Sequence, residues 1–271
     1  MVFGAVFRCL CFMVGRLHAR PCHGGLREVY YPPPMMSPGK PEVEVKLRVA
    51  DLAVFRRRLA RLRAQPAAKA GVHEMNTLFD TPQGGLAKHG QLLRLRVEEP
   101  RGKARSRRSA GARAVLTYKG PAVAGSAPAE AQEMPVASAQ GRPGDRPRGA
   151  PRNRYKVREE IEVEVADPQQ LGLILEALGL RGWFRYEKHR TSYRLPAALR
   201  WAADLKVELD ETPIGVFVEL EGSPQAIDRA AKLLGYGPAD YLTQTYLQLY
   251  LRQCRKEGLT PRDMLFPSKK I

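Results

Sequence analysis

Several runs of the chain alternate between charged and aliphatic residues, and this pattern constrains the fold more than any other feature. The clearest runs cover residues 42–49, 158–165 and 205–210. A period of two is typical of a β-strand, in which residues i, i+2 and i+4 share one face. Each of these strands therefore has one aliphatic face and one charged face. The chain is predicted to be α+β and mainly antiparallel β.

The charged faces are unusual because almost every position on them is ionic, and each sign is grouped by strand. Their members are Glu42, Glu44, Lys46 and Arg48; Arg94 and Arg96; Arg158, Glu160, Glu162 and Glu164; Lys206, Glu208 and Asp210; and Glu219 and Glu221. An ordinary sheet with one solvated face usually mixes in Ser, Thr and Gln, and this simpler interpretation remains open. We favour a closed antiparallel β-barrel with the charges inside and helices covering the aliphatic outer surface.

An ionic lumen must be solvated or filled by matched ions, because unpaired buried charge is very costly. A polyphosphate with divalent metal fits this requirement. Basic side chains would neutralise the phosphoryl oxygens, and paired carboxylates would hold Mg²⁺ or Mn²⁺, which prefer oxygen ligands.

Helices are predicted between the strands, at positions where a typical capping residue begins or ends a run with helical periodicity. Asp51 begins a helix over 52–63, Asp167 begins one that ends at Gly179, and a third runs from Ser223 to Gly235. Thr243 is predicted to cap a last, amphipathic helix. Further strands are expected near residues 75–79, 92–98, 114–119, 183–193, 199–210 and 215–221, and a turn over 81–85.

Composition divides the chain into a central domain with added segments. Residues 1–40 are predicted to be a disordered extension, with translation beginning at Met35 or Met36, and 257–271 a C-terminal tail. The domain covers 41–256 and carries a disordered basic insertion at 121–154. Residues 100–156 contain thirteen Lys and Arg but only three acidic residues, so much of the net charge of +17 lies in this segment. In the rest of the chain the numbers of acidic and basic residues are closer to equal, which weakens the interpretation that the charge serves to bind nucleic acid.

Cysteine usage and hydropathy predict a cytoplasmic protein that does not enter a membrane. Three of the four cysteines lie before residue 40, and none forms a CxxC pair, so free thiols in a reducing compartment are expected. The apolar stretch 1–14 is interrupted by Arg8 and is too short to cross a bilayer.

An ordered set of motifs resembles the CYTH family, the triphosphate tunnel metalloenzymes. Glu42-x-Glu44-x-Lys46 is similar to the family's ExExK signature. It is followed by Leu93-Arg94-Leu95-Arg96, Thr117-Tyr118-Lys119-Gly120, Arg158-x-Glu160-x-Glu162, Lys188-His189-Arg190, Leu209-Asp210 and the run from Gly215 to Glu221. The resemblance covers about residues 41–251 and implies an eight-stranded antiparallel tunnel. Leu78 departs from it, because many members carry tyrosine there.

The resemblance also implies roles for the charged residues. Lys46, Arg94, Arg96, Lys119, Arg158 and Arg190 would contact a triphosphate, and Glu42, Glu44, Glu160, Glu162, Glu219 and Glu221 would hold one or two divalent ions. Lys188, Lys206, Glu208 and Asp210 are further lumen candidates for which a structural or solvated role is equally open. No side chain is assigned as catalytic; a water activated by metal or by a lumen carboxylate would be the nucleophile.

These roles predict a metal-dependent enzyme whose partner is a small molecule containing a triphosphate. The favoured reaction is hydrolysis of inorganic tripolyphosphate, thiamine triphosphate or a nucleoside triphosphate. Two alternatives stay open: a class IV adenylate cyclase that forms cyclic AMP and pyrophosphate, and a non-catalytic module that binds polyphosphate or RNA through the basic insertion. The chain is expected to act as a monomer or homodimer.

Overall fold

The computed structural model describes residues 41–68, 70–101, 112–122 and 154–267, all within one compact unit that spans Pro38–Ile271. The predicted N-terminal extension and most of the predicted insertion lie outside the described residues. Within the described residues, no helix combines the length and apolar character needed to span a membrane.

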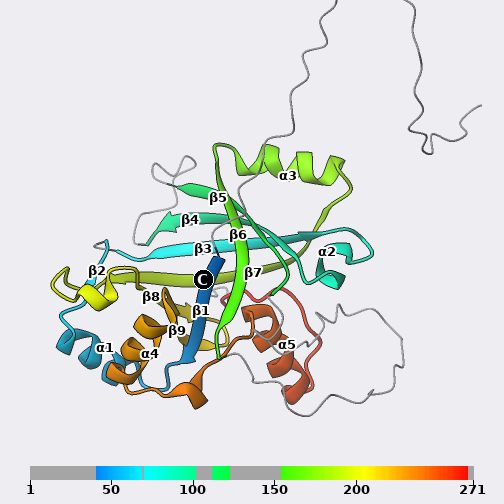
Figure 1. Cartoon of the computed structure of the whole chain (residues 1–271). Helices are drawn as coiled ribbons and strands as arrows, with labels where there is room; N and C mark the ends of the chain where they lie inside the picture. Colours follow the sequence, from blue (N-terminus) through cyan, green and yellow to red (C-terminus); the bar gives the residue numbers. More distant parts are fainter. Residues whose placement is uncertain (1–40, 69, 102–111, 123–153, 268–271) are drawn as a thin grey trace, which may run out of the picture. The chain divides into compact units, whose positions relative to one another are not determined.

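The core of the unit is a closed antiparallel barrel of eight strands (Figure 1). The barrel strands are β1 (Pro41–Arg48), β3 (Val72–Asp80), β4 (Leu92–Pro100), β5 (Arg113–Lys119), β6 (Lys156–Val165), β7 (Arg181–Arg194), β8 (Lys206–Thr212) and β9 (Gly215–Glu221). Their order is β7-β3-β4-β5-β6-β1-β9-β8, and pairing of β8 with β7 closes the ring. A two-residue strand, β2 (Gln65–Pro66), adds to the edge of β7. The predicted closed barrel is confirmed.

The aliphatic faces of the strands point outward, and helices cover those of β1 and β9, whereas Ile161 and Val163 on the outer face of β6 remain exposed. Val45 and Leu47 of β1 and Leu220 of β9 are fully buried in the largest hydrophobic cluster. Helices α1 (Leu52–Arg61) and α4 (Pro224–Leu233) complete this cluster, for example with Phe55 and Ile227. Burying each such side chain contributes about 1.5–3 kcal/mol. The packing therefore fixes which strand face is inside the barrel.

Three further helices complete the unit: α2 (Gly85–Lys88), α3 (Pro168–Ala177) and α5 (Tyr246–Glu257). Helix α3 begins as predicted, because the Asp167 side chain accepts hydrogen bonds from two backbone N–H groups of the first turn. Its Leu175 packs against Phe79 and Leu95 on the outside of the barrel.

Two local predictions need correction, and the structure adds detail to two others. The cap of α5 is Thr245, not Thr243, and it forms a capping box with Gln248. The strand expected from residue 199 begins only at Lys206, after a short 3₁₀ turn over Arg200–Ala202. Part of the turn predicted over 81–85 leads into α2. The described part of the predicted C-terminal tail packs against β7, where Met264 is buried and exchanges backbone hydrogen bonds with Arg185 and Glu187.

Candidate functional site

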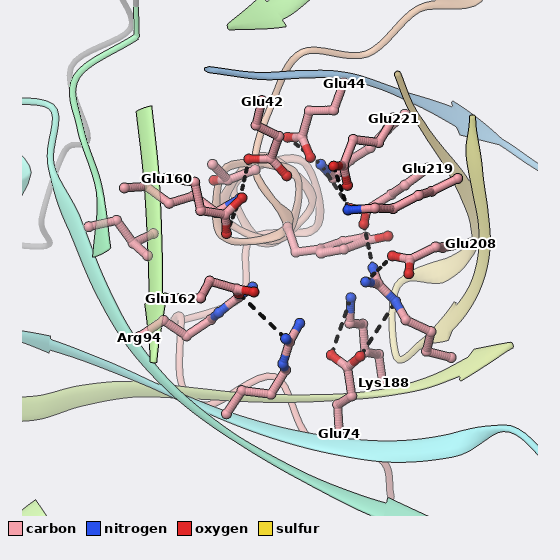
Figure 2. Close-up of a pocket in the computed structure, with 18 of the residues that line it drawn as sticks. Glu42, Glu44, Glu74, Arg94, Glu160, Glu162, Lys188, Glu208, Glu219 and Glu221 are labelled. Atoms are coloured by element: carbon pink, nitrogen blue, oxygen red, sulfur yellow. Dashed lines mark hydrogen bonds and ion pairs between the residues drawn. The ribbon is translucent and has the colours of Figure 1, made fainter. Parts of the chain in front are cut away.

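The inward faces of the barrel strands line a cavity of about 380 Å³ (Figure 2). Its wall is almost entirely ionic. The basic members are Lys46, Arg94, Arg96, Arg113, Lys119, Lys156, Arg158, Lys188, Arg190 and Lys206, and the acidic members are Glu42, Glu44, Glu74, Glu98, Glu160, Glu162, Glu208, Glu219 and Glu221. The two signs nearly balance, so the cavity has little net charge of its own.

The structure brings nearly all of the residues predicted for the site together. Each residue expected to contact phosphate or metal lines the cavity, as do Lys188, Lys206 and Glu208. Asp210 does not line it; its carboxylate is fully buried behind Lys188 and Arg190. Glu164 and Arg48, which share the charged strand faces, are also absent from the lining.

Several lining residues were missed from the sequence, most importantly Glu74, Lys156, Tyr186 and Tyr246. Lys156 continues the alternation of Arg158 by one step toward the N-terminus, so the pattern contained a signal for it. Glu74 was missed because the strand was expected to begin at Met75, whereas β3 begins at Val72. Tyr246 comes from helix α5, where alternation along strands gives no information.

A cluster of ion pairs lies on the β3 and β7 side of the barrel. Lys188 Nζ is 3.3 Å from Glu74 Oε2 and 3.0 Å from Asp210 Oδ2. Arg190 Nη2 is 2.7 Å from the same Asp210 oxygen. Burial alone would raise the pKa of Glu74, but the charges of Lys188 and Arg190 outweigh burial and hold that pKa at about 2. The carboxylate is therefore ionised and fixes both bases in place.

A second group of ion pairs joins β1, β9 and β6 on the opposite side, where Figure 2 shows Glu42, Glu44 and Glu221. Lys46 Nζ is 3.2 Å from Glu44 Oε1 and 2.9 Å from Glu219 Oε1. Glu44 also pairs with Lys156. Burial lowers the pKa of Lys156 to about 8, although the charge of Glu44 opposes this shift. Carboxylates and ammonium groups are thus interleaved on this wall.

Arg158 differs from the other buried bases because it has no carboxylate partner among the described residues. It is only 7% exposed, and within the described residues its side chain forms one hydrogen bond, from Nη2 to the carbonyl oxygen of Gly90, at 3.3 Å. Among the same residues, Nε and Nη1 have no hydrogen-bond partner. Burial lowers its pKa. A buried guanidinium with unused donors, facing a cavity, is suited to bind an anion there.

The carboxylates that line the cavity are grouped in a way that suits a divalent cation bound together with a substrate. Within the described part of the chain, no three acidic or histidine side chains are grouped closely enough to hold an ion by themselves. Pairs are present: Glu42 and Glu160 lie together, with Lys119 Nζ 2.6 Å from Glu42 Oε2 and 3.2 Å from Glu160 Oε1. Burial, and then a hydrogen bond with Glu42, raises the pKa of Glu160 to about 7. Such pairs fit Mg²⁺, which proteins usually hold by one or two carboxylates plus substrate phosphates.

The strands and the cavity lining define a closed barrel with an ionic lumen, and comparison with known proteins identifies the family. The model of the CYTH domain matches residues 40–246. The chain belongs to the CYTH family. No match to a curated protein was found.

Solved structures support the fold. A candidate adenylate cyclase from Vibrio parahaemolyticus is 17% identical, with a TM-score of 0.53, and the match covers 78% of this chain and 98% of that chain. The PH1819 protein from Pyrococcus horikoshii OT3 is 19% identical, with a TM-score of 0.52 and coverage of 79% and 98%. At these identities the likeness concerns the fold alone.

Proposed function

We propose that this chain hydrolyses a triphosphate with the help of a divalent cation inside the barrel. The observation that carries the proposal is Arg158, a buried cation that faces the cavity with unused donors. The Nε atom of Arg94 also lacks a hydrogen-bond partner within the described residues, whereas Arg96 Nε lies 2.9 Å from Glu98 Oε1. Arg94 on β4 and Arg158 on β6 therefore keep unused donors for phosphate oxygens.

Charge balance supports the participation of metal. A triphosphate carries about four negative charges, and a wall with nearly equal numbers of acids and bases cannot neutralise them alone. Mg²⁺ or Mn²⁺ would supply the missing positive charge and lower the charge on the phosphate oxygens. Its proposed ligands are Glu42, Glu44, Glu160, Glu162, Glu219 and Glu221. Lys46, Arg94, Arg96, Lys119, Arg158 and Arg190 would contact the phosphates.

In the proposed reaction water attacks a terminal phosphorus and the bridging P–O bond breaks. Tripolyphosphate plus water then gives pyrophosphate, phosphate and a proton. The bases would stabilise the charge that develops on the leaving oxygen. No residue is proposed as a covalent nucleophile.

The lining favours water over a ribose hydroxyl as the nucleophile. The cavity offers a phosphate chain many contacts, whereas its apolar lining is limited to a few side chains such as Val72 and Leu92. The neighbouring, mainly apolar cavity has only about 40 Å³, against about 380 Å³ for the charged cavity. Cyclisation would require a nucleoside to be held firmly beside its own triphosphate, and the described residues provide little surface for that.

A substrate panel with product identification tests the proposal. Tripolyphosphate, thiamine triphosphate and ATP are each incubated with Mg²⁺ or Mn²⁺, and phosphate, pyrophosphate and cyclic AMP are measured. We expect phosphate release that requires the cation and is strongly reduced, at the Mg²⁺ concentration used for the wild type, in Glu44→Gln and Arg96→Ala variants that remain folded. Cyclic AMP with pyrophosphate would indicate a cyclase instead, and no release from any substrate would reject hydrolysis.

A further inference from the structure

The inward faces of four strands change from charged to apolar at the same end of the barrel. The changes run from Glu74 through Asn76 to Leu78 in β3, from Lys188 through Tyr186 to Phe184 in β7, from Arg94 to Leu92 in β4, and from Glu219 to Phe217 in β9. Because each pair is separated by two positions, both members point into the barrel. Beyond the ionic section, the barrel interior is therefore filled by a hydrophobic cluster.

Helix α5 adds the rest of this cluster. Tyr246, Leu247 and Leu249 pack with Leu78, Phe184 and Phe217. Tyr246 lies at the boundary, since it belongs to the cluster and also lines the charged cavity.

Several contacts hold the ring of Tyr246 in place. Its hydroxyl donates a hydrogen bond of 2.7 Å to Asp210 Oδ2, and its ring lies edge-on to Phe217, with centroids 5.5 Å apart. The ammonium groups of Lys46 and Lys188 are each 5.3 Å from its centroid. The side chain is 5% exposed. It is a fixed wall between charged and apolar space.

The small apolar cavity lies on the other side of this wall. Leu92, Tyr186, Thr245 and Tyr246 line both cavities, so they form the partition. The side chains of Lys206 and Glu162, which also line the charged cavity, are 63% and 40% exposed. The charged cavity therefore opens to solvent away from Tyr246 and ends blindly at it.

We infer that the cavity takes phosphate chains by an unsubstituted terminal phosphate, and that Tyr246 is the wall at which this phosphate stops. The inference deepens the proposed function and rests on it. A free terminal phosphate is small and carries the highest charge of the chain, so it can enter first and reach Lys46 and Lys188. A chain esterified at both ends would have to push a nucleoside into the buried ionic section, separating ion pairs that the nucleoside cannot replace.

The first test compares two ligands with the same number of phosphates. Adenosine tetraphosphate has one free end, whereas diadenosine tetraphosphate has none. Calorimetric titration with Mg²⁺ measures the affinity of each for the full chain. We expect adenosine tetraphosphate to bind at least about tenfold more tightly than diadenosine tetraphosphate. Tenfold is the lower end of the range by which a pocket rejects a ligand that carries a group too large for it. Equal affinities would overturn the inference.

The second test moves the wall. Tyr246→Leu removes the ring and makes room beside Lys46 and Lys188, whereas Tyr246→Phe keeps the ring and loses only the hydroxyl. For each protein the affinities for tripolyphosphate and tetrapolyphosphate are measured, with circular dichroism to verify folding. We expect Tyr246→Leu to shift the ratio toward tetrapolyphosphate by about fivefold or more, and Tyr246→Phe to keep the wild-type ratio. An unchanged ratio in a folded Tyr246→Leu protein would contradict the wall.

If Tyr246→Leu does not fold, Tyr186→Leu replaces it, because Tyr186 belongs to the same partition. Both tests measure binding and are independent of turnover. Selective binding of free ends without hydrolysis would reject the proposed function and support the wall. Hydrolysis of a triphosphate together with equal affinities for adenosine tetraphosphate and diadenosine tetraphosphate would support the proposed function and reject the wall.

Discussion

The guanidinium of Arg190 lies against the carboxylate of Asp210 with two hydrogen bonds, from Nε to Oδ1 and from Nη2 to Oδ2, each 2.7 Å long. Arg190 also pairs with Glu208 and Glu219, which line the cavity. Asp210 therefore supports the cavity wall from behind without facing it.

We expect Asp210→Asn to destabilise the fold, because the change leaves Lys188 and Arg190 with less compensating charge. Removing one partner from a buried ion pair costs about 3–5 kcal/mol. Chemical denaturation measures the loss in the free energy of unfolding. Asp263→Asn is the control, because Asp263 pairs with the exposed Arg185, and exposed pairs contribute at most about 1 kcal/mol. Equal losses in the two variants would contradict the assignment of Asp210.

Arg158→Ala should separate binding from stability. Because burial disfavours the charge of Arg158 more than the carboxylates of Glu44 and Glu42 favour it, its removal relieves a buried charge that no ion pair within the described residues fully compensates. We expect the free energy of unfolding to stay equal or rise. The affinity for Mg²⁺-tripolyphosphate should fall by about tenfold or more, because the variant loses a hydrogen bond between charged groups. Titration calorimetry and denaturation measure the two effects. A less stable protein with unchanged affinity would show that Arg158 is structural.

Removing a carboxylate should raise the requirement for metal. Glu44→Gln and Glu160→Gln keep the side-chain shape and lose the charge. We expect the Mg²⁺ concentration for half-maximal activity to rise by at least about tenfold. Mutating a residue that only hydrogen-bonds to a metal ligand already lowers metal affinity by about this factor, and loss of a ligand should cost no less. Glu176→Gln, an exposed change on α3, is the control. A chelator should abolish activity in all variants, and identical Mg²⁺ curves would argue against these ligands.

The raised pKa of Glu160 predicts how stability depends on pH in the absence of metal. The folded chain keeps this proton up to about pH 7, whereas the unfolded chain loses it near 4.5. The folded state therefore binds more protons between these values, and the contribution of Glu160 to stability is full below pH 4.5 and is lost as the pH rises to 7. Relative to the wild type, Glu160→Gln should become more stable at pH 8 than at pH 5. Denaturation at both values gives this double difference, and parallel pH profiles would refute the shift.

The inward-facing residues of some strands could be predicted from the sequence, whereas those of others could not. Most of the inward charged residues of β1, β6 and β9 were recoverable, because charged and aliphatic residues alternate along most of each run. Glu74 was lost because β3 mixes Val72, Asn76 and Leu78 into its inward face, so its pattern does not mark the start of the strand.

Contacts between distant elements were harder to predict. The helical period of α5 indicates an apolar stripe but cannot show that Tyr246 enters the end of the barrel. Likewise, the lack of a partner for Arg158 depends on where every neighbouring carboxylate lies in space. The cap of α5 was within reach, since Gln248 follows Thr245 at the spacing of a capping box, a signal that Thr243 lacks.

The interleaved ion pairs of the lumen make ligand binding an exchange of partners. A phosphate oxygen that takes Lys46 or Lys119 must first release the carboxylate that this lysine holds, and the released carboxylate then becomes a ligand for a cation. Anion and cation should consequently bind with positive cooperativity, each strengthening the other by the same factor. A phosphate affinity that does not change with the Mg²⁺ concentration would rule this coupling out.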